Sequence, residues 1–254
     1  MNPLNLFRRR KASAQTTPTI KAILFDTFGT TVDWLSSMTI HAERLGAEKG
    51  INADWQGLIE AWRAQYQPAI KPVREGKRPW TGFDTLHREQ LDKILPKFGA
   101  AQRLTSQDRD LLTQGWHFLD PWPDVVPALS RLKHNLILGP LSNGATRQMV
   151  DLARWGHLPW DIVFGADMFR TYKPDKKLYL GAAAFLSLDP VEILMVAAHN
   201  QDLEAAKSHG LKTCFVQRPT EDPKPTGAYD YVVDNFEHLA QALNPSNSPL
   251  ALSF

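Results

Sequence analysis

The sequence predicts an α/β fold, a doubly wound parallel-sheet (Rossmann-like) core with a small helical domain inserted after the first strand. Three observations predict it. Residues 20–25 form a compact apolar segment that reads as a buried parallel strand. The next part of the chain, up to residue 118, shows helical periodicity without a convincing strand. After residue 121, short apolar segments alternate with helical ones, which is the pattern of βαβ units.

The core domain is expected to comprise residues 19–34 and 119–254. Its strands are bounded by polar turns, and apolar residues at helical spacing lie between them. Further strands are expected at residues 135–141, 161–164, 193–198, 212–217 and 231–233, with helices such as 145–155 and 175–186 between them.

Residues 35–118 are expected to form the helical insertion. Apolar side chains such as Leu45, Leu58 and Leu91 recur at helical intervals along it. The segment 68–79 is rich in proline and basic residues, and we expect it to be a loop because proline breaks helices.

Composition excludes several classes of protein. The formal net charge of the 254 residues is +2, too small to indicate a nucleic-acid partner. No run of eighteen apolar residues occurs, so no membrane span is expected. The single cysteine, Cys214, excludes an internal disulfide and fits a reducing compartment, so we expect a cytoplasmic protein. Residues 1–18, which include Arg8-Arg9-Arg10-Lys11, are expected to be a flexible basic tail, with a targeting peptide as the alternative.

Asp26 follows the first strand directly. Open α/β folds bind ligands at the carboxyl ends of their strands, so this acid is placed where a site is expected. Gly29 would allow the backbone to turn sharply after it. An aspartate here could instead simply cap a loop or a helix.

The stretch AILFDTFGTTVDW, which contains Asp26, resembles the first motif of the haloacid dehalogenase superfamily, and most closely that of the L-2-haloacid (type II) dehalogenases. The resemblance runs from about residue 19 to about residue 236, with later motifs in the expected order. It implies that Asp26 is a nucleophile that forms a covalent ester, that Thr30 supports it, and that residues 35–118 are a cap domain over the site.

Ser142-Asn143-Gly144 ends the second expected core strand. Hydroxyl and amide groups beside a helix N-terminus can bind an anion, although a helix cap explains them about equally well. The resemblance implies that Ser142 binds the substrate carboxylate and that Asn143 lies beside the departing halide.

Lys173, Tyr179 and Asp202 match later motifs of the family. Lys173 precedes a proline and a helix, and alone it would be read as a surface lysine. The resemblance implies that Lys173 reaches Asp26, that Tyr179 is an active-site tyrosine, and that Asp202 fixes Lys173 and prepares the hydrolytic water.

Phe28 separates two branches of the superfamily. Its phosphatases carry a second aspartate at this position, as general acid and magnesium ligand. Phenylalanine can neither donate a proton nor bind a hard cation, but it can line an apolar pocket. We therefore expect no metal and no cofactor.

The segment before Asp202 departs from the family pattern. His199 occupies the position of an asparagine that locates the hydrolytic water, and an imidazole could replace it. Alternatively, His199 packs behind the sheet. Asn200, counted with the substrate-binding residues, could also cap the following helix.

Trp62-Arg63 is similar to a Trp-Arg pair on a cap helix of the dehalogenases, which implies that Arg63 holds the halide and the carboxylate. Arg74 and Arg78 are nearby alternatives. The resemblance that these residues carry implies hydrolysis of short 2-haloacids, such as haloacetates and L-2-halopropionate, with a haloacid and a halide ion as ligands. A homodimer is expected only because the resemblance implies it. A magnesium-dependent phosphatase and a catalytically silent small-acid-binding member remain the alternatives.

Overall fold

The protein contains a five-stranded parallel sheet with strand order β2-β1-β3-β4-β5. The structure, a computed structural model, describes residues 19–243, so the expected tail at residues 1–18 and the last residues lie outside it. All four strand pairings are parallel, as predicted. The strands are β1 (Ala22–Phe25), β2 (Ile137–Pro140), β3 (Ile193–Ala197), β4 (Lys212–Val216) and β5 (Tyr231–Val233).

Helices cover both faces of this sheet, as a doubly wound fold requires. Alternate residues of the strands pack with α6 and α11 on one face, and the intervening residues pack with α9 and α10 on the other. The helices after the insertion are α6 (Val125–Leu132), α7 (Thr146–Trp155), α8 (Ala166–Phe169), α9 (Lys176–Leu186), α10 (Asn200–Ser208) and α11 (Phe236–Leu243), with a 3₁₀ turn η4 (Pro190–Glu192).

One expected strand is wrong. Residues 161–164 form only a single bridge, between Leu141 and Phe164. Asp161 explains this, because its carboxylate accepts the Leu138 amide at 3.0 Å and also binds Lys133. The Leu138 N–H of β2 is therefore hydrogen-bonded to a side chain and cannot pair with the backbone of a neighbouring strand.

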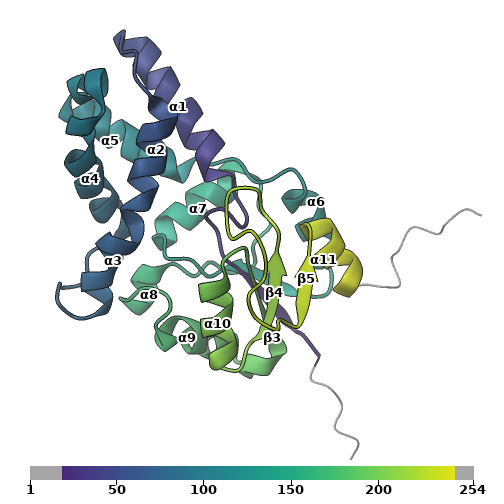
Figure 1. Ribbon diagram of the computed structural model, residues 1–254. Helices are drawn as coiled ribbons and strands as arrows, with labels where there is room; N and C mark the ends of the chain where they lie inside the picture. The colour runs from purple at the N-terminus through teal and green to yellow at the C-terminus, as the bar shows by residue number, and fades with distance from the viewer. Residues whose placement is uncertain (1–18, 244–254) are drawn as a thin grey trace, which may run out of the picture.

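The chain between β1 and α6 is helical, as predicted. Figure 1 shows α1 to α5 gathered into one body beside the sheet. No helix in residues 19–243 is long and apolar enough to cross a membrane. The helices are α1 (Trp34–Lys49), α2 (Trp55–Ala64), α3 (Tyr66–Arg74), α4 (Phe83–Ile94) and α5 (Ser106–Gln114), with 3₁₀ turns η1 (Leu95–Lys97), η2 (Gly99–Arg103) and η3 (Gly115–His117).

The expected loop at 68–79 is partly wrong, because α3 extends through Pro68 and Pro72 to Arg74. Pro68 lies in the first turn, where a backbone N–H has no helical partner to lose. Three apolar side chains, Ala69, Ile70 and Val73, are buried on the same helix and offset the cost of Pro72.

An aromatic core joins these helices to the end of the sheet. Phe28, from the loop after β1, stacks on Phe83 with ring centroids 5.7 Å apart and meets Trp116 at 6.0 Å. Trp116 in turn packs edge-on against Trp62 of α2. This packing positions α2 and α3 opposite the carboxyl ends of the strands.

Candidate active site

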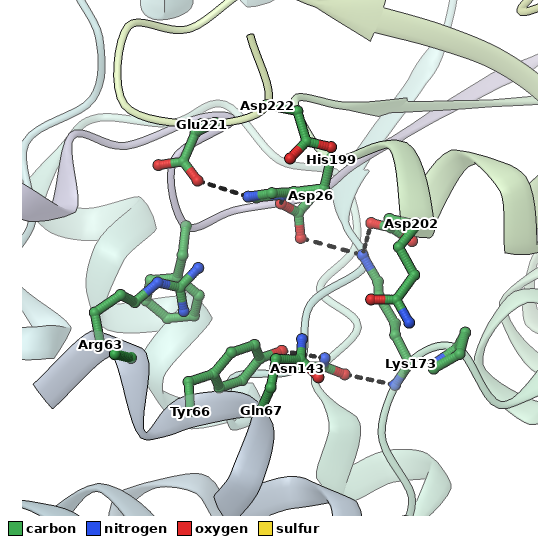
Figure 2. Close-up of a pocket in the computed structure, with 14 residues that line it drawn as sticks. Asp26, Arg63, Tyr66, Gln67, Asn143, Lys173, His199, Asp202, Glu221 and Asp222 are labelled. Carbon is green, nitrogen blue, oxygen red and sulfur yellow. Dashed lines mark hydrogen bonds and ion pairs between the residues drawn. The ribbon is translucent and has the colours of Figure 1, made fainter. Parts of the chain in front are cut away.

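A cavity of about 340 Å³ lies between the carboxyl edge of the sheet and the α2–α3 junction. Figure 2 shows side chains from both sides pointing into it. It is lined by Asp26, Phe28, Arg63, Ala64, Tyr66, Gln67, Asn143, Lys173, Pro174, His199, Gln201, Asp202, Glu221 and Asp222.

Asp26 is the centre of the site. Its amide donates to the Val196 carbonyl of β3, which fixes the backbone at the sheet edge. Its Oδ1 accepts from Lys173 Nζ at 3.2 Å, and its Oδ2 accepts from Thr30 at 2.9 Å and lies 3.0 Å from His199 Nδ1. Burial raises the pKa of Asp26, but the charges and hydrogen bonds of Lys173, His199 and Thr30 outweigh it and hold the pKa well below its usual range. Asp26 is therefore a carboxylate at neutral pH.

Lys173 links the two buried acids, an arrangement that the family resemblance implied and that Lys173 alone in the sequence did not. Its Nζ lies 2.5 Å from Asp202 Oδ2, and Tyr179 donates to the other oxygen of Asp202 at 2.7 Å. Lys173 and Asp202 are 6% and 7% exposed. Burial lowers the pKa of Lys173, but Asp202 and Asp26 together raise it above its ordinary value, so the side chain is an ammonium. Burial raises the pKa of Asp202.

Asn143 and Ser142 differ in their placement. Asn143 faces the cavity, where its Oδ1 accepts from the Lys173 amide at 2.7 Å and its Nδ2 donates to the Tyr66 hydroxyl. Ser142 is fully buried and does not line the cavity, and its Oγ accepts from the Gly144 amide at 3.1 Å. The structure therefore gives Ser142 a turn-forming contact, and the expected contact with a carboxylate stays a prediction.

Arg63 enters the cavity from α2. Its guanidinium lies 4.7 Å from the ring centroid of Tyr66, 5.4 Å from that of Trp34 and 5.9 Å from that of Phe28. It has no hydrogen-bond partner among residues 19–243, so its donors are available to an anion in the cavity. The alternatives are engaged elsewhere, since Arg74 donates to the Lys173 carbonyl and Arg78 pairs with Glu89.

His199 lies in the cavity and not behind the sheet. Its Nδ1 contacts Asp26, and its Nε2 lies 2.7 Å from Glu221 Oε2. Burial lowers the pKa of His199, but Asp26 and Glu221 together raise it to about 10. The side chain is therefore an imidazolium that donates to two carboxylates.

Asn200 does not line the cavity. His199, and not Asn200, occupies the N-cap position of α10. The Asn200 side chain donates to Asp222 at 2.8 Å and accepts from the Thr226 amide at 2.8 Å, so it holds the loop that follows β4. Its expected contact with substrate finds no support in this geometry.

Glu221 is a cavity residue that sequence reasoning missed. It lies in the loop between β4 and β5, at the same carboxyl edge as Asp26. A search for acids after the end of every strand, and not only after the recognised motifs, would have found it.

The donor set does not suit a magnesium ion. Phe28, which has no metal-binding atom, is packed among aromatic rings, and the Lys173 ammonium already neutralises charge between Asp26 and Asp202. Within residues 19–243 no group of three or more His, Cys, Asp or Glu side chains is arranged to hold a metal ion.

Comparison with known proteins agrees with this geometry. Residues 20–210 match the haloacid dehalogenase-like hydrolase family. (S)-2-haloacid dehalogenase 1 of Pseudomonas sp. (strain CBS-3) is 30% identical over 78% of this chain and 85% of its own. The crystal structure of a defluorinating L-2-haloacid dehalogenase is 41% identical, with a TM-score of 0.85 over 89% of this chain and 95% of that one. A second L-2-haloacid dehalogenase structure is 40% identical, with a TM-score of 0.85 over 89% of this chain and 99% of that one. The chain thus belongs to the haloacid dehalogenase-like hydrolase family.

Proposed function

We propose that the protein hydrolyses short 2-haloalkanoic acids, such as haloacetates and L-2-halopropionate, to 2-hydroxy acids. One observation carries the proposal: the ionised carboxylate of Asp26 faces a small cavity that also contains aromatic walls and an arginine, Arg63, with no hydrogen-bond partner in the described part of the chain. A carboxylate nucleophile, an anion-binding cation and apolar surface suit a small, negatively charged carbon–halogen compound. The dehalogenases similar to this chain support the assignment.

In the first step, Asp26 attacks C2 of the substrate from the side opposite the halogen. A bond forms between an Asp26 oxygen and C2, and the carbon–halogen bond breaks, so C2 is inverted and halide leaves. Arg63 and Asn143 reach into the cavity and can hold the anionic groups. Phe28 and the rings around Arg63 exclude water, which strengthens these charge contacts.

In the second step, water attacks the carbonyl carbon of the Asp26 ester. The 2-hydroxy acid is released and the Asp26 carboxylate is restored. Lys173 and His199 keep Asp26 ionised at the start of each cycle, and Lys173 and Asp202 lie where they can orient the water. A covalent nucleophile divides one difficult displacement into two easier steps.

The helices of residues 35–118 are assigned the role of a cap domain in this scheme. They supply Arg63 and Tyr66 to the cavity, opposite the sheet that supplies Asp26. Closure over bound substrate would exclude water during the first step. We further assign a homodimer, which the family resemblance implies, and a cytoplasmic location, which the single cysteine favours; size-exclusion and fractionation experiments would test them.

A panel of substrates tests the function and gives our first prediction, which is metal independence. Purified protein is incubated with fluoro-, chloro- and bromoacetate and both enantiomers of 2-chloropropionate, with and without a chelator, and halide release is measured. We expect halide release from the haloacetates and from the (S)-enantiomer of 2-chloropropionate, with inversion at C2 of the latter. The chelator should have no effect, because Phe28 replaces a metal ligand. Halide release that is lost with chelator and rescued by magnesium would contradict metal independence, and no release from any of these substrates would contradict the proposed function.

The second prediction concerns Arg63. Removing one well-aimed donor costs about 10²–10³ in rate, so Arg63→Ala should lose at least that much in kcat/KM for chloroacetate. The matched control is Arg44→Ala, because Arg44 is an exposed arginine that pairs with Glu48 on α1. A near-normal kcat/KM in Arg63→Ala would move halide binding to another residue of the cavity.

A further inference from the structure

Glu221 lies on the side of His199 away from Asp26, as Figure 2 shows. Only 7% of its side chain is exposed, and neither step of the proposed reaction uses it. One oxygen lies 2.7 Å from His199 Nε2, and the other accepts from the Trp34 indole at 2.7 Å. Both oxygens of this carboxylate are therefore fixed.

The loop after the nucleophile is shaped to admit Glu221. Gly29 has a φ of +84°, and a Cβ atom there would lie 2.2 Å from Glu221 Cδ. Only glycine adopts this conformation readily and leaves that space. The backbone at Gly29 thus leaves the space that Glu221 occupies against the loop after Asp26.

The contacts of Asp26 distinguish its two oxygens. Thr30 and His199 both approach Oδ2, at 2.9 and 3.0 Å, whereas Oδ1 has the longer contact of 3.2 Å with Lys173. Thr30 is itself held, because its hydroxyl accepts from the Ala198 amide at 2.9 Å. Oδ1 is accordingly the oxygen that attacks C2, and Oδ2 becomes the carbonyl oxygen of the ester. Negative charge develops on that oxygen when water attacks.

Formation of the ester changes the charge around His199. In the resting enzyme burial opposes the imidazolium of His199, whereas Asp26 and Glu221 both favour it. The Arg63 guanidinium, which faces the same cavity, helps to lower the pKa of Glu221. The ester of Asp26 has no charge. Glu221 is then the carboxylate that remains in contact with His199 among the described residues.

We propose that His199 and Thr30 form an oxyanion site for hydrolysis of the Asp26 ester, and that Glu221 is a positioning residue that keeps His199 charged once the ester has formed. The inference rests on the proposed function, since it concerns the second step of that reaction. The water oxygen bonds to the ester carbon, and the carbonyl electron pair moves to Oδ2. The bond between this carbon and Oδ1 then breaks, Oδ1 leaves with its electron pair as the oxygen of the product hydroxyl, and the pair on Oδ2 re-forms the carbonyl. One water proton ends on the product hydroxyl and the other in solvent, while His199 keeps its own proton throughout.

Glu221→Gln tests the proposal, because it keeps the shape of the side chain and removes its charge. Excess enzyme reacts once with (S)-2-chloropropionate between pH 6 and 9, and halide and the enzyme-bound ester, seen by intact mass, are followed in time. We expect ester hydrolysis to slow more than halide release, by at least about tenfold at pH 8, because the charge-assisted donation to Oδ2 is lost. Hydrolysis should recover toward pH 6, where His199 regains its proton, and the wild type should show no such recovery.

The matched control is Glu204→Gln, which makes the same charge change on the exposed side of α10 and should match the wild type. Equal ester hydrolysis in Glu221→Gln and wild type at pH 8 would overturn the proposal. So would equal slowing of both steps without a change in pH profile. Failure of the proposed function is distinguishable, because the wild type would then form no ester on Asp26.

A second measurement does not depend on turnover. Nitrogen-15 NMR of labelled histidine, assigned with His199→Gln, reports the charge on His199 in the resting protein. We expect an imidazolium above pH 8 in the wild type and a pKa at least one unit lower in Glu221→Gln. An unchanged pKa of His199 in the variant would remove Glu221 from this role.

Discussion

Replacing Asp26 by asparagine is expected to abolish halide release. The amide has nearly the shape of the carboxylate but lacks the negative charge that attacks C2. Losing a covalent nucleophile costs more than losing one donor, so halide release should fall by at least about 10⁴-fold. Halide release by Asp26→Asn and wild type is compared at equal protein concentration, with thermal unfolding as the control for folding. Retained turnover in the folded variant would exclude Asp26 as the nucleophile.

Isotope labelling identifies the bond that water breaks. One turnover with excess wild-type enzyme in heavy-oxygen water should place the label in Asp26 and not in the product, because water attacks the aspartyl carbonyl. Peptide mass spectrometry locates the label. A labelled 2-hydroxy acid after one turnover would show instead that water attacks the substrate directly.

The sheet could be predicted from the sequence because its strands are short and apolar, and the three central ones, β1, β3 and β4, are buried on both faces. Residues 231–233 were predicted with the bounds observed, and the strand before Asp26 differs only by its first two residues. Residues that directly follow parallel strands meet at one edge, so Asp26 could be placed there. That Lys173 and Asp202 would join it was implied only by resemblance to a known family.

The features that could not be predicted depend on side chains distant in the sequence. The expected strand at 161–164 fails because Asp161 binds a backbone amide of β2. The helix at 66–74 tolerates its prolines because of tertiary burial of Ile70 and its neighbours. Glu221 belongs to no expected motif, and its role depends on contacts with Trp34 and His199 from separate parts of the chain. Local propensity contains none of this information.

The charges of the site form one connected arrangement. Asp26 lies between two cations, His199 and Lys173, and each cation has a second carboxylate behind it, Glu221 or Asp202. Glu221 therefore raises the pKa of His199, and Asp202 raises that of Lys173. Both cations lower the pKa of Asp26. Removing Lys173 should consequently affect the nucleophile more strongly than removing a residue that only contacts substrate.

Replacing Lys173 by alanine is expected to lower kcat/KM for chloroacetate by at least about 10²–10³. The change leaves Asp26 and Asp202 facing each other without the ammonium, so the pKa of Asp26 should rise. A larger share of Asp26 is then protonated at a given pH, and the acid limb of the pH–rate profile moves to higher pH. Breaking a buried ion pair also destabilises the fold by about 3–5 kcal/mol, which denaturant unfolding measures.

The matched control for this change is Lys176→Ala, because Lys176 is an exposed lysine close to Lys173 in the sequence, at the start of α9. It should retain the wild-type rate, pH profile and free energy of unfolding. The two variants are compared under conditions in which both remain folded. A Lys173→Ala protein with a reduced rate but an unshifted acid limb would show that Lys173 acts after ester formation and not by keeping Asp26 ionised. A near-normal rate would remove Lys173 from the mechanism.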